Sequence, residues 1–307
     1  MLALFSGFVE RIGRNHAMMV RIGLFVVWLL HFLPLPVLAP IGEAFGMLLY
    51  WFGRERRRVA RTNLRLCFPD RDDKDRERLV RRHFRAFGRS VLERGILWWS
   101  SRRRIQRLVR IEGIEHWHAV KDKPVIWLAP HFVGLDMGGV RLTSEFPLVS
   151  MYANQKNPVF NRVLYRSRTR FGMTRLASRQ EGIRPIVKGL KDGLPFYYLP
   201  DMDYGPRDAI FVPFFGVPAA TITGLSRLAR LAGASVVPCV TRQLSGGRGY
   251  VLKFYPAWQN FPGESVEEDT RRMNRFIEEC VLEMPEQYFW LHKRFKTRPP
   301  GEERYYK

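Results

Sequence analysis

The chain has 307 residues, enough for one large α/β domain or two small ones. It carries 51 Lys and Arg against 29 Asp and Glu, a formal net charge of +22, which indicates a polyanionic partner: nucleic acid, an anionic membrane surface or an acidic protein. An aromatic content of 13% with eight Trp suits a membrane interface better than a simple nucleic-acid module. Three widely spaced cysteines indicate no disulfide framework and favour a reducing compartment.

Residues 1–53 differ from the rest of the chain because they are mainly apolar. Pro34 and Pro36 interrupt an apolar run that resumes at Val37, and basic residues lie on both flanks. About 20 apolar residues are needed to cross a bilayer, and the first run barely reaches that length. Either one helix crosses, or a proline-broken hairpin enters from the cytoplasmic side; a cleaved signal peptide is the competing interpretation. We expect a retained membrane anchor over 1–53 and a separate domain over 54–307.

Residues 54–110 are predicted to be helical and strongly basic. Arginines alternate with apolar residues at three- and four-residue spacing over 81–96, which predicts an amphipathic helix with a cationic face. That face is either solvated or in contact with anionic headgroups, because it follows the membrane segment.

From residue 111 onward, predicted strands alternate with predicted helices. The strand candidates are Val125–Ala129, Leu148–Tyr152, Phe196–Leu199, Ser235–Thr241 and Tyr250–Tyr255. Helices are expected over 134–145, 157–171, 181–192, 221–232 and 266–283. This alternation predicts an α/β fold with a central, mostly parallel sheet flanked by helices.

A histidine follows the first of these strands, and an aspartate follows it five positions later. His131 is expected at the carboxyl end of the strand, where open α/β sheets place their ligands. The pair meets only if His131 precedes the next helix and Asp136 lies in its first turn. Asp136 would then hold one ring nitrogen and leave the other free to take a proton from a hydroxyl. The alternative is a structural histidine, with Asp136 as a charge at the start of a helix.

A second cluster of notable residues covers 199–221. A strand is expected to end at an acidic turn that contains Asp201, and Arg207 follows as a candidate phosphate ligand or as a surface residue. The aromatic and proline residues of 211–218 are expected to form a stiff loop that walls a pocket for an acyl chain and leads into a helix near Thr221.

Several familiar signatures are missing from the sequence. It contains no G-x-S-x-G nucleophile elbow, no Walker A loop and no G-x-G-x-x-G. His116 and His118 have no Cys or acidic cluster nearby in sequence, so a metal site is not expected. No cofactor is expected either.

Taken together, these motifs resemble the Gram-negative lipid A late acyltransferases. The resemblance rests on His131-x4-Asp136 and on four further blocks, which occur in the family's order over nearly the whole chain: Arg61-Thr62-Asn63-Leu64 with Cys67-Phe68-Pro69, the Pro200-Asp201 to Gly205-Pro206 turn, Phe211-Val212-Pro213-Phe214-Phe215-Gly216, and the tail from Pro285 to Pro299. Many members of this family have Glu in place of Asp136, and either carboxylate can orient a histidine.

The resemblance implies a fold, a reaction and a location. It implies a glycerolipid-acyltransferase-like α/β fold and transfer of a fatty acyl group from acyl carrier protein to a hydroxyl of a hydroxyacyl chain on Kdo-lipid IVA. The enzyme would act at the cytoplasmic face of a bacterial inner membrane, with His131 and Asp136 as a general-base dyad. As a separate hypothesis, four arginines are expected to bind the phosphates or sugar acids of the acceptor, with solvated surface charge as the alternative: Arg166, Arg168, Arg170 and Arg207. Asp201, in the acidic turn, is a further candidate for contact with the acceptor.

Two other functions stay open at this point. A related membrane acyltransferase could act on another lipid, such as a phosphatidylinositol mannoside. A membrane-bound nucleic-acid-binding protein would fit the charge, but it would explain neither the His131-Asp136 pair nor the apolar block, so no nucleic-acid partner is expected.

Overall fold

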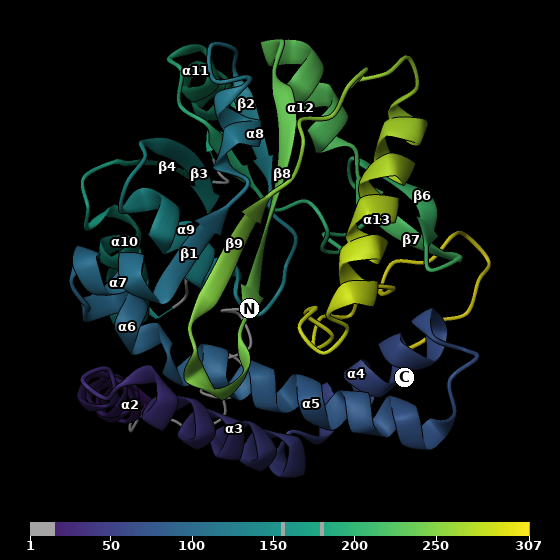
Figure 1. Ribbon diagram of the computed structural model, residues 1–307. Coiled ribbons are helices and arrows are strands. Elements are labelled where there is room, and N and C mark those ends of the chain that lie inside the picture. The colour runs from purple at the N-terminus through teal and green to yellow at the C-terminus, as the bar shows by residue number, and fades with distance from the viewer. Residues whose placement is uncertain (1–15, 155–156, 179–180, 307) are drawn as a thin grey trace.

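The computed structural model describes residues 16–154, 157–178 and 181–306. Its centre is a seven-stranded sheet in the order β1-β9-β8-β2-β5-β3-β4, in which every neighbouring pair is parallel except β8 and β9. The strands are β1 (Val109–Glu112), β2 (Val125–Leu128), β3 (Leu148–Tyr152), β4 (Thr174–Ser178), β5 (Phe196–Tyr198), β8 (Ser235–Gln243) and β9 (Tyr250–Phe254). The expected α/β fold with a mostly parallel sheet is therefore confirmed (Figure 1).

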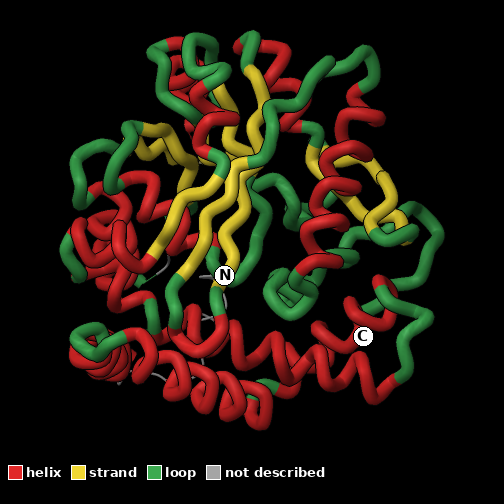
Figure 2. The backbone as a smooth tube through the Cα atoms, in the orientation of Figure 1, coloured by secondary structure: helices red, strands yellow, loops and turns green. Residues whose placement is uncertain are grey.

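Helices surround this sheet (Figure 2). The N-terminal group is α2 (His16–Leu30), α3 (Leu35–Phe52), α4 (Arg54–Cys67), α5 (Asp73–Leu92), α6 (Arg94–Trp99) and α7 (Arg102–Leu108). The later helices are α8 (Ile114–His118), α9 (Leu135–Thr143), α10 (Pro158–Thr169), α11 (Arg184–Lys191), α12 (Gly224–Ala232) and α13 (Val266–Glu283), with a short 3-10 turn, η2 (Ser245–Gly247). The helices expected after residue 130 all form, with ends within three residues of the expected ones.

Strand β2 shows why the sheet is apolar through its whole thickness. All four of its residues are buried, and it lies between β5 and β8. Because alternate side chains point to opposite faces, Ile126 and Leu128 join the core layer that contains α13, whereas Val125 and Trp127 join the layer that contains α9. A strand covered on both faces has no place for polar side chains, hence the continuous apolar run.

The segment expected to be a stiff apolar loop is a β-hairpin instead. Strands β6 (Ala209–Phe214) and β7 (Val217–Ile222) pair antiparallel and lie beside α13 (Figure 1). Pro213 pairs with Pro218, and a two-stranded ribbon tolerates prolines because each strand is also an edge, with part of its N–H groups directed outward. The prediction of a stiff loop over 211–218 was therefore wrong.

Helix α3 packs closely along α5 at the base of the molecule (Figure 1). A Cβ atom added at Gly46 would lie 2.1 Å from the Phe84 carbonyl oxygen, and one added at Gly88 would lie 2.3 Å from the Gly46 nitrogen. Only glycines permit this approach of two helix backbones. The same face of α3 buries Leu35, Leu38 and Tyr50.

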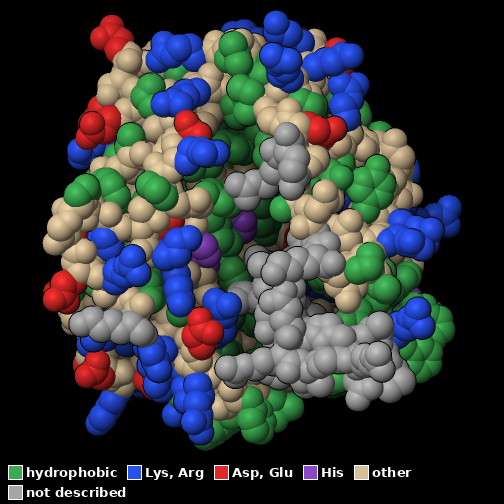
Figure 3. Space-filling model, turned by 180° about the vertical axis from the view of Figure 1, so that it is seen from behind, with side chains coloured by type: hydrophobic (Ala, Val, Ile, Leu, Met, Phe, Trp, Pro, Cys, Tyr) green, Lys and Arg blue, Asp and Glu red, His purple; other side chains and the backbone are tan. Residues whose placement is uncertain are grey.

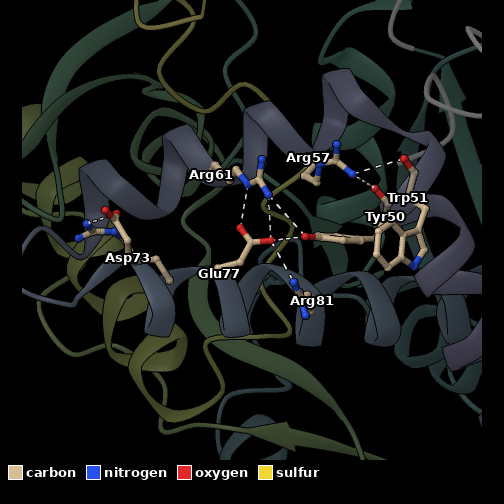
Figure 4. Close-up of polar contacts among 8 residues, drawn as sticks. Tyr50, Trp51, Arg57, Arg61, Asp73, Glu77 and Arg81 are labelled. Atoms are coloured by element: carbon tan, nitrogen blue, oxygen red, sulfur yellow. Dashed lines mark hydrogen bonds and ion pairs between the residues drawn. The ribbon is translucent and has the colours of Figure 1, made fainter.

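Polar contacts also join α3, α4 and α5, and Figure 4 shows them converging on Glu77. Arg61 forms two hydrogen bonds with the Glu77 carboxylate, at 2.7 and 3.0 Å, and the Tyr50 hydroxyl donates to the same group. Arg57 donates to the Tyr50 carbonyl oxygen at 2.6 Å, near the end of α3. These contacts attach α3 to the helices that follow it.

Candidate active site

His131 and Asp201 lie side by side because their strands are neighbours. Leu128, the last residue of β2, pairs in register with Tyr198, the last residue of β5. His131 and Asp201 each lie three residues beyond these paired ends, so the parallel register brings them to the same edge of the sheet. This edge is where open α/β sheets bind ligands.

The Asp201 carboxylate makes two hydrogen bonds to His131. The His131 ring Nδ1 lies 2.6 Å from Asp201 Oδ1, and the His131 backbone N–H donates to Oδ2 at 2.9 Å. The Asp201 side chain is 1% exposed and that of His131 is 12% exposed. Burial acts to raise the pKa of Asp201, but the attraction and hydrogen bonds of His131 outweigh it and hold the pKa below its ordinary value.

This geometry fixes the histidine tautomer. An ionised carboxylate only accepts hydrogen bonds, so the neutral imidazole carries its proton on Nδ1. Nε2 then keeps its lone pair and can take a proton. The pair is arranged as a general base and its orienting carboxylate.

The expected hydrogen bond between His131 and Asp136 is not formed within the described residues. Asp136 Oδ2 accepts a hydrogen bond from Arg94 at 2.8 Å, across the contact between α9 and α6. Burial acts to raise the pKa of Asp136, but the charges of Arg94 and Arg168 lower it further than burial raises it. Asp136 does lie in the first turn of α9, as predicted, but its side chain pairs with Arg94 on α6. The position beside the imidazole that was expected for Asp136 is occupied by Asp201.

His131 lines a cavity of about 860 Å³. Figure 3 shows this face of the molecule hollowed, with histidine side chains inside and Lys and Arg around the opening. Its polar and charged lining includes His131, Arg168, Tyr198, Arg207, Arg227 and His292. Several apolar side chains on its rim are also exposed, among them Tyr165, Ile183, Tyr204 and Leu231.

A smaller, mainly apolar pocket of about 90 Å³ adjoins the cavity. The two share Met151, Leu164, Arg168, Leu176, Tyr197 and Leu199 as lining residues. Asp136, Gly139 and Thr143 follow one face of α9 along this pocket, a distance of roughly 10 Å at 1.5 Å per residue. An apolar extension beside a general base suits a substrate with a hydrocarbon chain.

The predicted acceptor-binding arginines are placed differently from one another. Arg168 and Arg207 line the cavity, and Arg207 is exposed. Arg166 is exposed but is not a lining residue. Arg170 donates to the Ser100 carbonyl oxygen and lies 4.3 Å from the centre of the Phe171 ring, and burial lowers its pKa to about 10.

The C-terminal tail packs against the segment that carries His131. The Phe289 N–H donates to the His131 carbonyl oxygen at 2.9 Å, and the Val133 N–H donates to the Gln287 carbonyl oxygen at 2.8 Å. His292, three residues beyond Phe289, reaches the cavity. The sequence identified this tail only as a family motif and gave His292 no role, and it placed Arg94 on the cationic face of a helix instead of in the site. The signal of both residues is spatial, since both lie far from His131 in sequence.

The family model and the curated relatives in sequence point to one family. The model of the bacterial lipid A biosynthesis acyltransferases matches residues 8–297. The lipid A biosynthesis lauroyltransferase of Escherichia coli K12 is 36% identical over 91% of this chain and 92% of its own length, and the palmitoleoyltransferase of that strain is 33% identical over 92% and 93%. The 1-acyl-sn-glycerophosphate acyltransferase structure from Thermotoga maritima covers 81% of this chain and 96% of its own, with 16% identity and a TM-score of 0.39. With a family model covering nearly its full length and relatives of this similarity, the chain belongs to the bacterial lipid A biosynthesis acyltransferase family.

Proposed function

We propose that this enzyme transfers a fatty acyl group from acyl carrier protein to a hydroxyl of a hydroxyacyl chain on Kdo-lipid IVA, as an O-acyltransferase. The observation that carries the proposal is the His131–Asp201 pair at the wall of the large cavity, with an apolar pocket adjoining it. Lipid A acylation is the activity of the family. The donor, the acceptor and the residue roles are our assignments.

The chemistry requires one base and no protein nucleophile. His131 Nε2 takes the proton of the acceptor hydroxyl while the oxygen attacks the thioester carbonyl, so a C–O bond forms and the carbonyl becomes an oxyanion. The intermediate collapses, the C–S bond breaks, and the protonated His131 returns its proton to the departing thiolate. Asp201 holds the ring through Nδ1 and stabilises the cation that forms in between.

Asp136 remains part of the proposed catalytic group, with a different contact from the one expected. Its ion pair with Arg94 lines the apolar pocket, as does Arg168. We propose that this pair keeps the pocket in shape for the acyl chain.

The basic residues fit both proposed substrates. The acceptor is a phosphorylated anion and acyl carrier protein is acidic, and the chain carries a net charge of +22. We propose that Arg168 and Arg207 contact the acceptor's anionic groups directly. Arg166 and Arg170 would contribute from outside the cavity lining, and Asp201 acts on His131 in addition to any contact with the acceptor.

We further propose that the protein works at the cytoplasmic face of the bacterial inner membrane, attached through residues 1–53, with the acyltransferase domain over 54–307. Among the described residues, α3 is the helix long and apolar enough to cross a membrane. The exposed large apolar side chains of α2 and α3 support attachment to membrane lipids.

An assay with the purified protein tests the function. Acyl carrier protein charged with saturated chains of different lengths would be incubated with Kdo-lipid IVA, and the products identified by mass spectrometry. We expect one added acyl chain, and a loss of roughly 100- to 10,000-fold with His131→Ala. Transfer to a phosphatidylinositol mannoside but not to Kdo-lipid IVA would replace the proposal with acylation of another lipid.

A further inference from the structure

His292 is a second histidine in the cavity that contains His131, and the reaction written above does not use it. Its Nε2 atom accepts a hydrogen bond from the Asp203 backbone N–H at 3.0 Å. A backbone N–H can only donate, so Nε2 must hold a lone pair. In a neutral ring the proton is therefore on Nδ1.

The Nδ1 edge of His292 is available to a ligand. Within residues 16–154, 157–178 and 181–306, Nδ1 has no hydrogen-bond partner. It is also not one of the fully buried side-chain atoms that lack a partner in those segments, so it keeps some accessible surface. His292 lines the cavity and its Nε2 atom is taken up by Asp203, so Nδ1 is the ring nitrogen left for a ligand there.

The backbone around His292 is held firmly in place. The Asn63 side-chain amide donates to the carbonyl oxygens of Trp290 and His292, at 2.8 and 2.7 Å. Asp203, which supplies the N–H to the ring, is itself fixed, because its carboxylate accepts hydrogen bonds from the Thr297 N–H and hydroxyl at 2.6 and 2.8 Å. A donor needs this rigidity if it is to stabilise charge without first reorganising.

The electrostatic surroundings favour a neutral ring. Burial lowers the pKa of His292 to about 3, and the neighbouring His131 and Arg294 lower it in the same direction. The ring therefore stays neutral over the range in which a histidine base operates, and it donates one hydrogen bond without competing for the proton that His131 must take.

We propose that His292 is a catalytic residue whose Nδ1–H donates to the thioester oxygen as that oxygen becomes an oxyanion. The proposal rests on the acyl transfer proposed above. During the step the proton stays on Nδ1, and only the hydrogen bond strengthens as the carbonyl takes up charge. His131 moves the proton, and His292 stabilises the charge.

Two substitutions separate this role from a structural one. The amide of Gln reaches the position of Nε2, so His292→Gln can accept from the Asp203 N–H but has no donor at the Nδ1 position. The amide of Asn reaches the position of Nδ1, so His292→Asn keeps a donor toward the cavity but loses the contact with Asp203. We expect His292→Gln to keep the wild-type melting temperature and to lose roughly 100- to 1,000-fold in kcat, as for removal of one oxyanion donor, with KM little changed.

The Asn variant should behave in the opposite way, with a lower melting temperature but a higher kcat than the Gln variant. His118→Gln, on the exposed face of α8, is the matched control and should keep wild-type kinetics. If Gln retained wild-type turnover while Asn lost both stability and turnover, His292 would only support the loop and the proposal would be overturned.

The tautomer provides a readout that does not depend on activity. Nitrogen-15 NMR of the histidine side chains should show His292 neutral, with its proton on Nδ1, from pH 5 to pH 8. A proton on Nε2 or a titration in that range would overturn the inference even if acyl transfer is confirmed. Conversely, a wild-type protein without acyl transfer would remove the proposed function, whatever the tautomer.

Discussion

At the scale of single residues, two carboxylates near His131 have distinct partners: Asp201 binds the imidazole, and Asp136 binds Arg94. Asp201→Asn leaves one acceptor oxygen for two donors, the His131 backbone N–H and its Nδ1–H. With the amide NH2 facing Nδ1 the ring would favour the wrong tautomer, so we expect a loss of roughly 100- to 10,000-fold in kcat with the fold retained. Asp136→Asn removes the negative charge that pairs with the buried Arg94 side chain, so it should lower the melting temperature and reduce kcat less than Asp201→Asn does. Steady-state kinetics and thermal unfolding check both.

A larger loss of kcat in Asp136→Asn than in Asp201→Asn would contradict this assignment of the two carboxylates. If Asp136→Asn lost more turnover at an unchanged melting temperature, Asp136 would become the partner of His131 once substrate is bound. The Arg94–Asp136 pair would then have to open during the reaction.

The cavity arginines allow a second test at this scale. Arg168→Ala and Arg207→Ala should each raise the KM for the acceptor more than they change kcat, because they remove a charge that binds an anion in both ground and transition states. Arg162→Ala, an exposed arginine on the same helix as Arg168, serves as the control. Wild-type acceptor kinetics in both cavity variants would exclude the anion-binding role.

Residue types were easier to predict than their contacts. The position of His131 at a strand end followed from one apolar run and the residues after it. The partner of its Nδ1 atom did not, because Asp201 is 70 positions away and reaches His131 only through the register of β2 and β5. Asp136 was predicted as the partner of His131 because it is close to it in sequence, and the sequence gives no other measure of distance between two residues.

At the scale of elements, the contact between α3 and α5 depends on glycine. Gly46→Ala would place a methyl group against the Phe84 carbonyl, so we expect a loss of stability of about 1–3 kcal/mol, as for overpacking. Gly23→Ala in α2 is the matched control, because no atom lies within 4 Å of its added Cβ, and alanine is about 1 kcal/mol more favourable than glycine inside a helix. Urea unfolding measures both. Equal stability of the two variants would mean that α3 does not pack on α5 in solution.

The sequence predicted elements with strong periodicity and missed short or unusual ones. Strand β3 and helix α13 have the predicted ends, since an apolar run or a helical face defined them clearly. Strands β1 and β4 lie toward the two edges of the sheet and mix polar with apolar residues, so neither was predicted. Hairpin β6–β7 was missed because its prolines are tolerated only in a ribbon with two edges.

At the scale of the whole molecule, the packing of α3 limits how the protein can meet a membrane. One face of α3 is buried against α5, and the exposed residues of the opposite face include the large apolar side chains Val37, Ile41, Leu48, Trp51 and Phe52. If α3 crossed the bilayer in this arrangement, it would bring the exposed arginines of α5 with it: Arg81, Arg82 and Arg85. Each arginine at the centre of a membrane costs about 3 kcal/mol or more. We therefore expect α3 to lie in the plane of the interface, with α2 beside it.

This orientation predicts which side chains hold the protein on lipid. Changing Ile41, Leu48 and Trp51 together to glutamine keeps good helix formers in α3 but removes roughly 2 kcal/mol of apolar burial per side chain. Attachment should then depend on arginines such as Arg54 and Arg58, so the variant should leave anionic vesicles at high salt, whereas the wild-type protein stays bound. Leu282→Gln, which removes an equally exposed leucine from α13, should sediment with vesicles like the wild type. If the triple variant also stayed bound at high salt, the membrane contact would have to lie elsewhere, and the exposed face of α3 would need another explanation.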